Sequence, residues 1–273
     1  RGKAKADIMK TKKVIIDARR DALLKELKTA GHLTVDELVE RLHVSPLTIR
    51  RDLQYLNDHG FIDRFYGGAS IINFVGTEHD PASSNEPYKH AIAKYAAQYV
   101  KDNDVLFINT SSTALLLLSY IKGKRVTVVT NNGKAIFIDH DPMITIVLCG
   151  GELRFPKESM VGDFALNNLN KVTVNKCFLG CSGIDVHSGI STSIIQEVSI
   201  NEAMIRRCNG PVFILADSTK VGLIHQFNAC DIHAIQYLIT DKRLKPEQLD
   251  EFLDAGINTI CLDPLYNFDS KYA

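Results

Sequence analysis

The sequence contains no hydrophobic run long enough to cross a membrane. Its longest apolar stretch is ALLLL at 114–118, whereas a transmembrane helix needs about 20 apolar residues. The N-terminal residues are charged and lack the apolar core of a secretory signal peptide. These absences argue against a membrane protein and predict a cytoplasmic one.

The usual binding motifs for metals and nucleotides are also missing. Six cysteines are present, but Cys177 and Cys181 lack the paired CxxC spacing and the histidines of a zinc site. The glycines form neither a Walker motif nor a GxGxxG fingerprint. We therefore expect buried free thiols, no metal and no cofactor.

The net formal charge is zero, but the charges are unevenly distributed along the chain. Residues 1–70 contain 14 lysines and arginines against 10 acidic residues, and the remaining 203 residues contain 18 against 22. A basic segment joined to an acidic one favours a polyanion as partner of the first. Part of the excess lies in a basic tail, 1–16, in which Met9 is a candidate natural start, so that residues 1–8 would be an addition.

Residues 17–70 carry the signals of a small helical domain. Apolar residues recur at helical spacing between 18 and 30, and Gly31 follows as a C-cap. Thr34 and Glu37 have capping-box spacing at the start of a second helix, TVDELVERL. The pattern predicts two helices that lead into a tight turn.

A third helix follows this turn. Ser45 is a natural N-cap, and Pro46 suits the first helical position, where no N–H is needed. At 100° per residue, Ile49, Leu53 and Leu56 form one buried stripe. Two short helices joined by such a turn predict a helix-turn-helix.

The opposite face of the third helix is rich in groups that can bind DNA. Arg51 points directly away from the buried stripe and Arg50 lies on a flank, whereas Asp52 is nearer the core and is expected to brace a neighbouring element. Arginine can bind guanine or phosphate, and glutamine can read adenine. A solvated charged face is the alternative interpretation of this arginine pair. The candidate DNA-binding residues are Ser45, Leu47, Thr48, Arg50, Arg51, Gln54 and Tyr55.

The segment FIDRFYGGAS, 61–70, predicts a two-stranded hairpin closed by Gly67 and Gly68, after a helix that ends at Gly60. Arg64 and Tyr66 are placed where such a wing could touch a phosphate or the minor groove. Helix, helix, turn, helix and wing together predict a winged helix-turn-helix.

The stretch VDELVERLHVSPLTIRRDLQYLNDHGFIDRFYGGA closely resembles the N-terminal signature of DeoR-type bacterial transcriptional regulators. The resemblance covers most of residues 17–70 and implies DNA binding. His43 stands where the family usually has glycine, a mild departure because histidine tolerates unusual backbone angles better than most residues.

Residues 71–88 are polar, contain Pro81 and Pro87, and predict a linker. Beyond them, from 89 to 263, apolar strands alternate with helices. Continuous apolar strands in such an alternation predict a mostly parallel sheet covered on both faces. The predicted strands are VLFIN, RVTVVT, ITIVLCG, KCFLGC, PVFILA, AIQYLIT and TICL, and the tail 264–273 carries no signal.

Small polar residues follow five of these strands. Because the carboxyl ends of parallel strands meet at one edge, ligands bind there. Hydroxyls and amides at a helix N-terminus, with a lysine nearby, can cradle a phosphate, and Asn131, Asp185 and Asp217 can bind sugar hydroxyls. Any one loop is ordinary for an α/β protein, but five converge on one rim. They are NTSST at 109–113, TNN at 130–132, CGGE at 149–152, GCSGID at 180–185 and ADSTK at 216–220.

These loops resemble the sensor half of DeoR-type regulators, which shares its fold with ribose-5-phosphate isomerase, over about 89–262. The resemblance implies a phosphorylated sugar or sugar-acid effector. Two departures are expected to alter effector choice: Asn109 and Ser111 replace the family's acid and glycine, and Asn201 stands in place of a common lysine. The expected effector-binding residues are Asn109, Ser111, Ser112, Thr113, Asn131, Gly150, Gly151, Asp185, Asp217 and Lys220.

The main hypothesis is a repressor that binds double-stranded operator DNA, responds to a sugar phosphate and forms a homodimer or homotetramer. The rival is a sugar-phosphate isomerase or hydrolase with a DNA-binding appendage. It needs a general base, for which Asp185, Glu197 and Asp217 are candidates, although Asn109 removes one carboxylate from the rim. A DNA-packaging protein is a third possibility, and it leaves the polar rim unexplained.

Overall fold

The chain divides into two compact units, the first ending at residue 79 and the second beginning at residue 80. The computed structural model describes residues 16, 18–58, 61–65, 67–71, 85–155 and 157–266. None of the helices in these ranges has the length and apolar character that a membrane crossing requires.

Local capping signals determine where the first helices of the N-terminal unit start and stop. The helix over 18–30 ends at Gly31, which has a φ of 79°, and the Gly31 amide donates to the Leu27 carbonyl at 2.8 Å. Helix α2 (Val35–Leu42) begins with the predicted capping box, in which the Glu37 amide donates to Thr34 Oγ1 at 3.3 Å and the Thr34 amide donates to Glu37 Oε2 at 2.7 Å.

The turn after α2 depends on His43, which adopts the left-handed conformation (φ 54°, ψ 40°) that closes a helix end. Helix α3 (Pro46–Asp58) follows, and Ser45 Oγ accepts a hydrogen bond from the Thr48 amide at 3.3 Å. The predicted cap and the predicted first helical residue of α3 are confirmed.

The core of this unit is the predicted apolar stripe. Ile49 and Leu53 are completely buried and Leu56 almost so, and they cluster with Leu23 and Leu27 of the first helix. Burying a large aliphatic side chain contributes about 1.5–3 kcal/mol, so this stripe determines which face of α3 remains outside.

The wing is larger than the predicted hairpin. Strands β1 (His32–Thr34), β2 (Ile62–Phe65) and β3 (Gly68–Ile71) form an antiparallel sheet in the order β1-β3-β2. Gly68 was expected in the turn, but it belongs to β3 and pairs with Phe65. Tyr66 and Gly60 lie outside the described residues.

The second unit contains the predicted parallel sheet, and all seven predicted strands are present. Its order is β15-β14-β12-β9-β4-β5-β6, and every neighbouring pair is parallel. The strands are β4 (Val105–Ile108), β5 (Val126–Thr130), β6 (Ile144–Leu148), β9 (Lys176–Leu179), β12 (Val212–Leu215), β14 (Tyr237–Asp241) and β15 (Asn258–Leu262).

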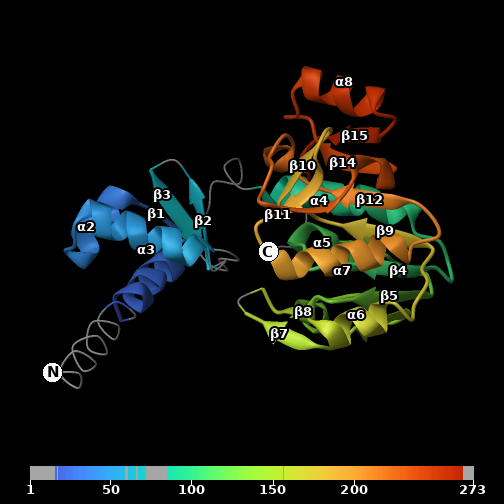
Figure 1. The fold of residues 1–273 in the computed structure, drawn as a ribbon, viewed down its shortest axis with the longest axis horizontal. Helices are drawn as coiled ribbons and strands as arrows, with labels where there is room; N and C mark the ends of the chain where they lie inside the picture. The colour runs from blue at the N-terminus through green and yellow to red at the C-terminus, as the bar shows by residue number, and fades with distance from the viewer. Residues whose placement is uncertain are drawn as a thin grey trace. The chain divides into compact units, whose positions relative to one another are not determined.

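Alternate residues of these strands enter two separate cores. Ile108, Phe178 and Phe213 pack against α4 (Glu86–Ala96) and α5 (Ser112–Tyr120) on one face. Phe107 and Leu179 pack on the other, against α6 (Asp163–Leu169), α7 (Ile195–Arg206) and α8 (Pro246–Asp254). Figure 1 shows α8 beside β15 at one end of the sheet and α6 at the opposite end.

Two small sheets complete the unit. Strands β7 (Glu152–Arg154) and β8 (Ser159–Val161) form a hairpin, and β10 (Gly183–Asp185), β11 (Gly189–Thr192) and β13 (Phe227–Cys230) form an antiparallel sheet. The single-turn helices are η1 (Ala97–Tyr99), η2 (Gly133–Ile136), η3 (Ser218–Lys220) and η4 (Ile232–Ala234).

The predicted linker is shorter at its C-terminal end than the sequence suggested. Helix α4 begins at Glu86, with Pro87 in its first turn, because a proline ring is compatible with that turn. At the far end, the Leu265 amide donates to the Pro87 carbonyl at 2.9 Å, so the start of the C-terminal tail packs against the start of α4.

Candidate functional site

The exposed face of α3 carries the residues predicted to meet DNA. Arg50, Arg51 and Gln54 are exposed, and Leu47 exposes 58% of its surface. Within the described residues, neither Arg50 nor Arg51 forms a hydrogen bond or an ion pair. Ser45 and Thr48 bind each other through their hydroxyls at 2.9 Å, so both lie at the N-terminal end of this face.

Asp52 has the bracing position expected of it. It is 2% exposed, and its carboxylate pairs with Arg19 at 2.5 Å and with Arg20 at 3.1 Å. The hydrogen bond from Arg19 to Asp52 raises the pKa of Arg19. Asp52 therefore joins α3 to the first helix.

Tyr55 is less free than the sequence suggested. The guanidinium carbon of Arg20 lies 3.4 Å from the centre of its ring, which covers one face of the tyrosine. Arg64 lies in β2 opposite Ala69, but its side chain, like the whole of Tyr66, falls outside the described residues.

In the second unit, the five polar loops follow strands that end at the same edge of the sheet. Strands β5 and β6 lie on one side of β4, and β9, β12 and β14 lie on the other. After β4, the chain first adds strands on one side of the sheet and then, from β9 onward, on the other. Open α/β sheets bind ligands at such a switch point, here between β4 and β9.

Asn109 occupies that point. Its Nδ2 donates to the Gly180 carbonyl at 2.9 Å and to Asn201 Oδ1 at 3.0 Å, while its Oδ1 accepts from the Gly180 amide at 3.0 Å and the Ser111 amide at 3.3 Å. A Cβ at position 180 would lie 1.9 Å from Ser111 Oγ, so only glycine fits there. The two departures from the family pattern, Asn109 and Asn201, thus bind each other as a neutral pair.

Ser111, Ser112 and Thr113 begin α5. Ser111 is the N-cap and accepts from the Ala114 amide at 3.3 Å, Ser112 is exposed, and Thr113 is buried. Thr110, between Asn109 and this cap, accepts a hydrogen bond from Asn131 Nδ2 at 3.0 Å. The loop after β4 therefore touches the loop after β5.

Asn131, Gly150 and Gly151 lie on the β5–β6 side. Asn131 is 1% exposed, and its Oδ1 has no hydrogen-bond partner among the described residues. Gly151 has a φ of 111°, and a Cβ there would lie 2.6 Å from the Val161 carbonyl oxygen. The glycine pair thus allows β8 and the start of α6 to approach the rim.

Asp217 and Lys220 lie on the β12 side. Asp217 is buried and caps η3, accepting from the Thr219 amide at 3.1 Å. Lys220 is half-buried, and its ammonium makes no hydrogen bond or ion pair with the described residues. Burial raises the pKa of Cys181 to about 12; the charge of Lys220 opposes this rise and the charge of Asp217 adds to it.

The Asp185 carboxylate forms its hydrogen bonds within its own turn. Its Oδ1 accepts from the His187 amide at 2.9 Å and the Ser188 amide at 3.0 Å, between β10 and β11. The other predicted effector residues follow strands of the main sheet directly, whereas Asp185 ends a strand of the small antiparallel sheet.

Two family models match the chain. The DeoR-like helix-turn-helix domain matches residues 19–74, and the DeoR C-terminal sensor domain matches residues 84–242, which is more than half of the sequence. The chain belongs to the DeoR family. It is a DNA-binding transcriptional regulator.

Full-length relatives agree with this DeoR assignment. The chain is 32% identical over 248 residues to the HTH-type transcriptional regulator GolR of Listeria innocua, covering 88% of this chain and 96% of the relative. It is 31% identical to the lactose phosphotransferase system repressor of Lactococcus lactis, covering 86% and 94%. It is 30% identical to the glycerol-3-phosphate regulon repressor of Escherichia coli K12, covering 82% and 90%.

Solved structures similar to this DeoR-family chain are more distant. Ribose 5-phosphate isomerase A of Methanocaldococcus jannaschii has a TM-score of 0.36 at 18% identity, over 50% of this chain and 55% of the isomerase. The eIF2B delta subunit of Chaetomium thermophilum has a TM-score of 0.40 at 15% identity, over 74% and 62%.

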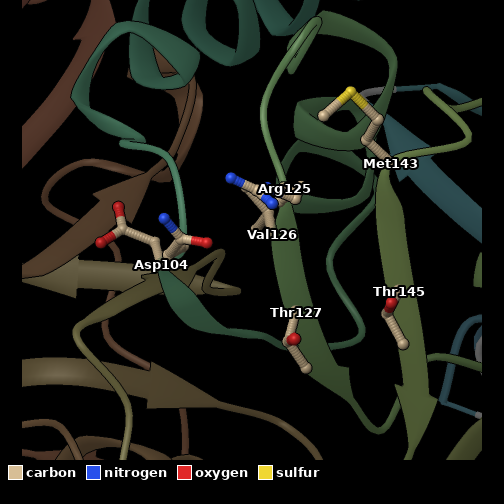
Figure 2. A pocket seen from close by; sticks show the side chains of 7 residues that line it. Asp104, Arg125, Val126, Thr127, Met143 and Thr145 are labelled. Atoms are coloured by element: carbon tan, nitrogen blue, oxygen red, sulfur yellow. The ribbon is translucent and has the colours of Figure 1, made fainter.

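A depression in the sensor unit lies away from the rim. It has a volume of about 340 Å³ and lies at the amino ends of β4, β5 and β6, where Figure 2 shows Asp104, Arg125 and Thr127 around it. Asp104 is neutralised by Lys176, at 2.6 Å, and Arg125 lies 3.5 Å from Asp102. Because its acidic and basic groups are paired, this depression is a weaker candidate for binding an anion than the rim.

Arg154 is a polar group on the rim side that the sequence did not single out. It ends β7, three residues after Gly151, and its Nη1 is buried without a hydrogen-bond partner among the described residues. The only signal in the sequence is an arginine soon after the Gly-Gly pair, which is too common to mark a site.

Proposed function

We propose that this DeoR-family regulator represses genes for the catabolism of a sugar or related carbohydrate, and that a phosphorylated sugar metabolite changes its affinity for the operator. The observation that carries the proposal is the exposed pair Arg50 and Arg51 on α3, which has no hydrogen bond or ion pair to a described residue. In the second unit, Lys220 at the polar rim is likewise without a partner among the described residues. The names of two relatives, a lactose phosphotransferase system repressor and a glycerol-3-phosphate regulon repressor, support this class of effector.

The recognition helix in this proposal is α3, which enters the major groove with its exposed face. Arg51 projects opposite the buried stripe and reads base edges, and Arg50 on the flank clamps a phosphate. Leu47 offers an apolar contact for a thymine methyl group. The brace between Asp52 and the first helix keeps this face in a single orientation.

The effector in this proposal lies across the carboxyl ends of β12, β9, β4 and β5. Lys220 supplies positive charge for the phosphate, and the amides at the start of α5 add hydrogen-bond donors. Asn109 contributes by holding Gly180, Ser111 and Asn201 in place, because its own polar atoms are already occupied. We propose Ser112 and Asn131 as contacts for sugar hydroxyls.

The protein in this proposal senses its ligand without converting it. The three acidic residues that could act as a general base have structural partners: Asp185 and Asp217 cap turns, and Glu197 accepts from Thr192 Oγ1 at 2.9 Å and lies 3.7 Å from Lys157 Nζ. These contacts support a regulator over an isomerase. A homodimer or homotetramer in the cytoplasm suits binding to paired operator half-sites.

The test is an operator titration with the full chain. We expect a thermal-shift screen of phosphorylated sugars and sugar acids to identify a stabilising ligand, and that ligand to change the dissociation constant for the operator by at least fivefold. The neutral parent sugar is the control. Tight operator binding that no phosphorylated sugar or sugar acid alters would overturn the effector class, and turnover of the ligand would restore the enzyme hypothesis.

A further inference from the structure

The hairpin of β7 and β8 is hydrogen-bonded to the loop that follows β5. The Met160 amide donates to the Asn131 carbonyl at 2.7 Å, the Gly133 amide donates to the Glu158 carbonyl at 2.8 Å, and Ser159 pairs with Asn132 as an isolated bridge. These contacts place one side of the hairpin directly against the rim.

The turn of the hairpin also reaches the start of α7. Lys157 Nζ lies 3.7 Å from Glu197 Oε1, and α7 carries the Asn201 that holds Asn109. The hairpin is therefore attached to both the β5 side and the α7 side of the rim, and groups on its inner surface lie next to the proposed effector site.

Four buried polar atoms in this region have no hydrogen-bond partner among the described residues: Asn131 Oδ1, Arg154 Nη1, Glu158 Oε2 and Ser159 Oγ. The Glu158 oxygen has a counterion, because Lys134 Nζ lies 3.1 Å from it, whereas the other three atoms have neither a hydrogen bond nor an ion pair with a described residue. Arg154 and Ser159 are direct partners across the hairpin, so their side chains leave the same face of it. Asn131 adjoins Asn132, the bridge partner of Ser159. Leaving a buried polar group unpaired costs about 1–3 kcal/mol, and native proteins contain few of them.

Arg154 differs from Arg243, an exposed arginine of the same unit. Arg243 pairs with Asp241 at 2.8 Å, bonds to Asn85 and stacks on Tyr88 at 3.6 Å. The guanidinium of Arg154 has no hydrogen bond or ion pair with any described residue. A guanidinium that is partly withdrawn from water without a counterion is destabilising. An anion-binding site without its ligand is expected to contain such a cation.

We infer that Arg154, Ser159 and Asn131 form a subsite under the hairpin for an anionic group of the effector and an adjacent hydroxyl. The guanidinium binds the anionic oxygens, and Asn131 Oδ1 accepts a hydrogen bond from the hydroxyl. Ser159 Oγ forms a further hydrogen bond to the effector. This inference rests on the proposed function and adds to it a second cation, on the opposite side of β4 from Lys220.

The experiment compares the wild-type chain, R154M, R154K and S159A, with R243M as the control in which an ion-paired arginine is removed. Thermal unfolding is followed without ligand and with inorganic phosphate, glucose 6-phosphate, fructose 6-phosphate, 6-phosphogluconate or glucose. Without ligand, R154M should unfold at the same temperature as wild type or higher, because it removes an unpaired cation, whereas R243M should unfold at a lower temperature.

With the anionic probe that stabilises wild type most, R154M should bind at least tenfold more weakly, S159A roughly fivefold more weakly, and R154K in between because it keeps the charge but loses the planar fork. Ligand-free R154M that unfolds below wild type, or R154M and R154K that both bind the probe as wild type does, would overturn the subsite alone. A wild type that binds none of the anionic probes would overturn the effector class of the proposed function and the subsite with it.

Discussion

At positions 50, 51 and 52, helix α3 carries two exposed arginines and one buried aspartate. Each step of the helix turns the side chain by 100°, so neighbours in the sequence meet different environments. Asp52 faces the first helix and neutralises charge on Arg19 and Arg20. Arg50 and Arg51 face outward on different sides of the exposed surface, which separates their expected contacts with DNA.

Replacing Arg51 by alanine should weaken operator binding by roughly tenfold to a hundredfold, because a bidentate base contact is worth about 1–3 kcal/mol of discrimination. Replacing Arg50 should weaken binding to all sequences about equally and reduce the salt slope by about 1. Fluorescence anisotropy titrations with operator and scrambled duplexes at several salt concentrations separate the two. Equal losses on both duplexes for Arg51→Ala would show that it contacts only the backbone.

Replacing Asp52 by alanine should lower the stability of the N-terminal unit by about 2 kcal/mol, because two hydrogen bonds to a buried carboxylate are lost. It should also weaken DNA binding, since Arg20 loses the partner that holds it over Tyr55. Urea unfolding measures the first effect. Asp36→Ala, an exposed acid on α2, is the control, and equal stability of the two variants would contradict the bracing role.

At the scale of the element, the turn between α2 and α3 sets the position of α3, the proposed recognition helix. His43 provides the left-handed residue, and its amide donates to the Val39 carbonyl at 2.9 Å. Such a conformation costs a residue with a Cβ about 1–2 kcal/mol, less for residues that tolerate it and nothing for glycine.

His43→Val should therefore destabilise the N-terminal unit by about 1–2 kcal/mol and weaken operator binding, because a branched side chain disfavours the left-handed turn. His43→Gly should be neutral or slightly stabilising. Thermal unfolding and operator titration of both variants check this. A valine variant as stable as the glycine variant would mean that the turn can adopt another geometry.

At the scale of the whole molecule, a basic first unit is joined to a more acidic second unit that holds the rim. The proposed function requires the two to be energetically coupled. Coupling between binding sites is reciprocal, so the factor by which an effector changes DNA affinity equals the factor by which DNA changes effector affinity.

Lys220→Ala should shift the effector dose curve at least tenfold towards higher concentration while leaving operator affinity without effector unchanged. In wild type, saturating operator DNA should change the effector dissociation constant by the same factor, roughly 5- to 150-fold, by which effector changes the operator dissociation constant. Calorimetric titration with and without DNA measures both. An unchanged dose curve for Lys220→Ala would remove this lysine from the phosphate site.

Much of the fold follows from local patterns. The seven strands of the main sheet are continuous apolar runs, and the caps at Gly31, Thr34 and Ser45 lie where the residue types require them. Strand β1 was missed because three residues are too short to show an alternation, and its pairing with β3 joins positions 32–34 to 68–70. The same shortness hid β7, β8 and β10, whereas β11 and β13 have four residues each but lack a continuous apolar run.

The sequence by itself indicated the family, through a stretch that resembles DeoR-type regulators. It also determined the strands of the main sheet and the buried stripe of α3, because periodicity and capping act over a few residues. Only the tertiary structure decided which polar groups are already satisfied. Asn109 meets Gly180 and Asn201, 71 and 92 positions away, and Asp52 meets Arg19, 33 positions away. Arg154 Nη1, Asn131 Oδ1 and Ser159 Oγ stand out only because the fold buries them without a hydrogen-bond partner among the described residues. Hydrogen bonds and burial depend on which distant segments the fold brings together.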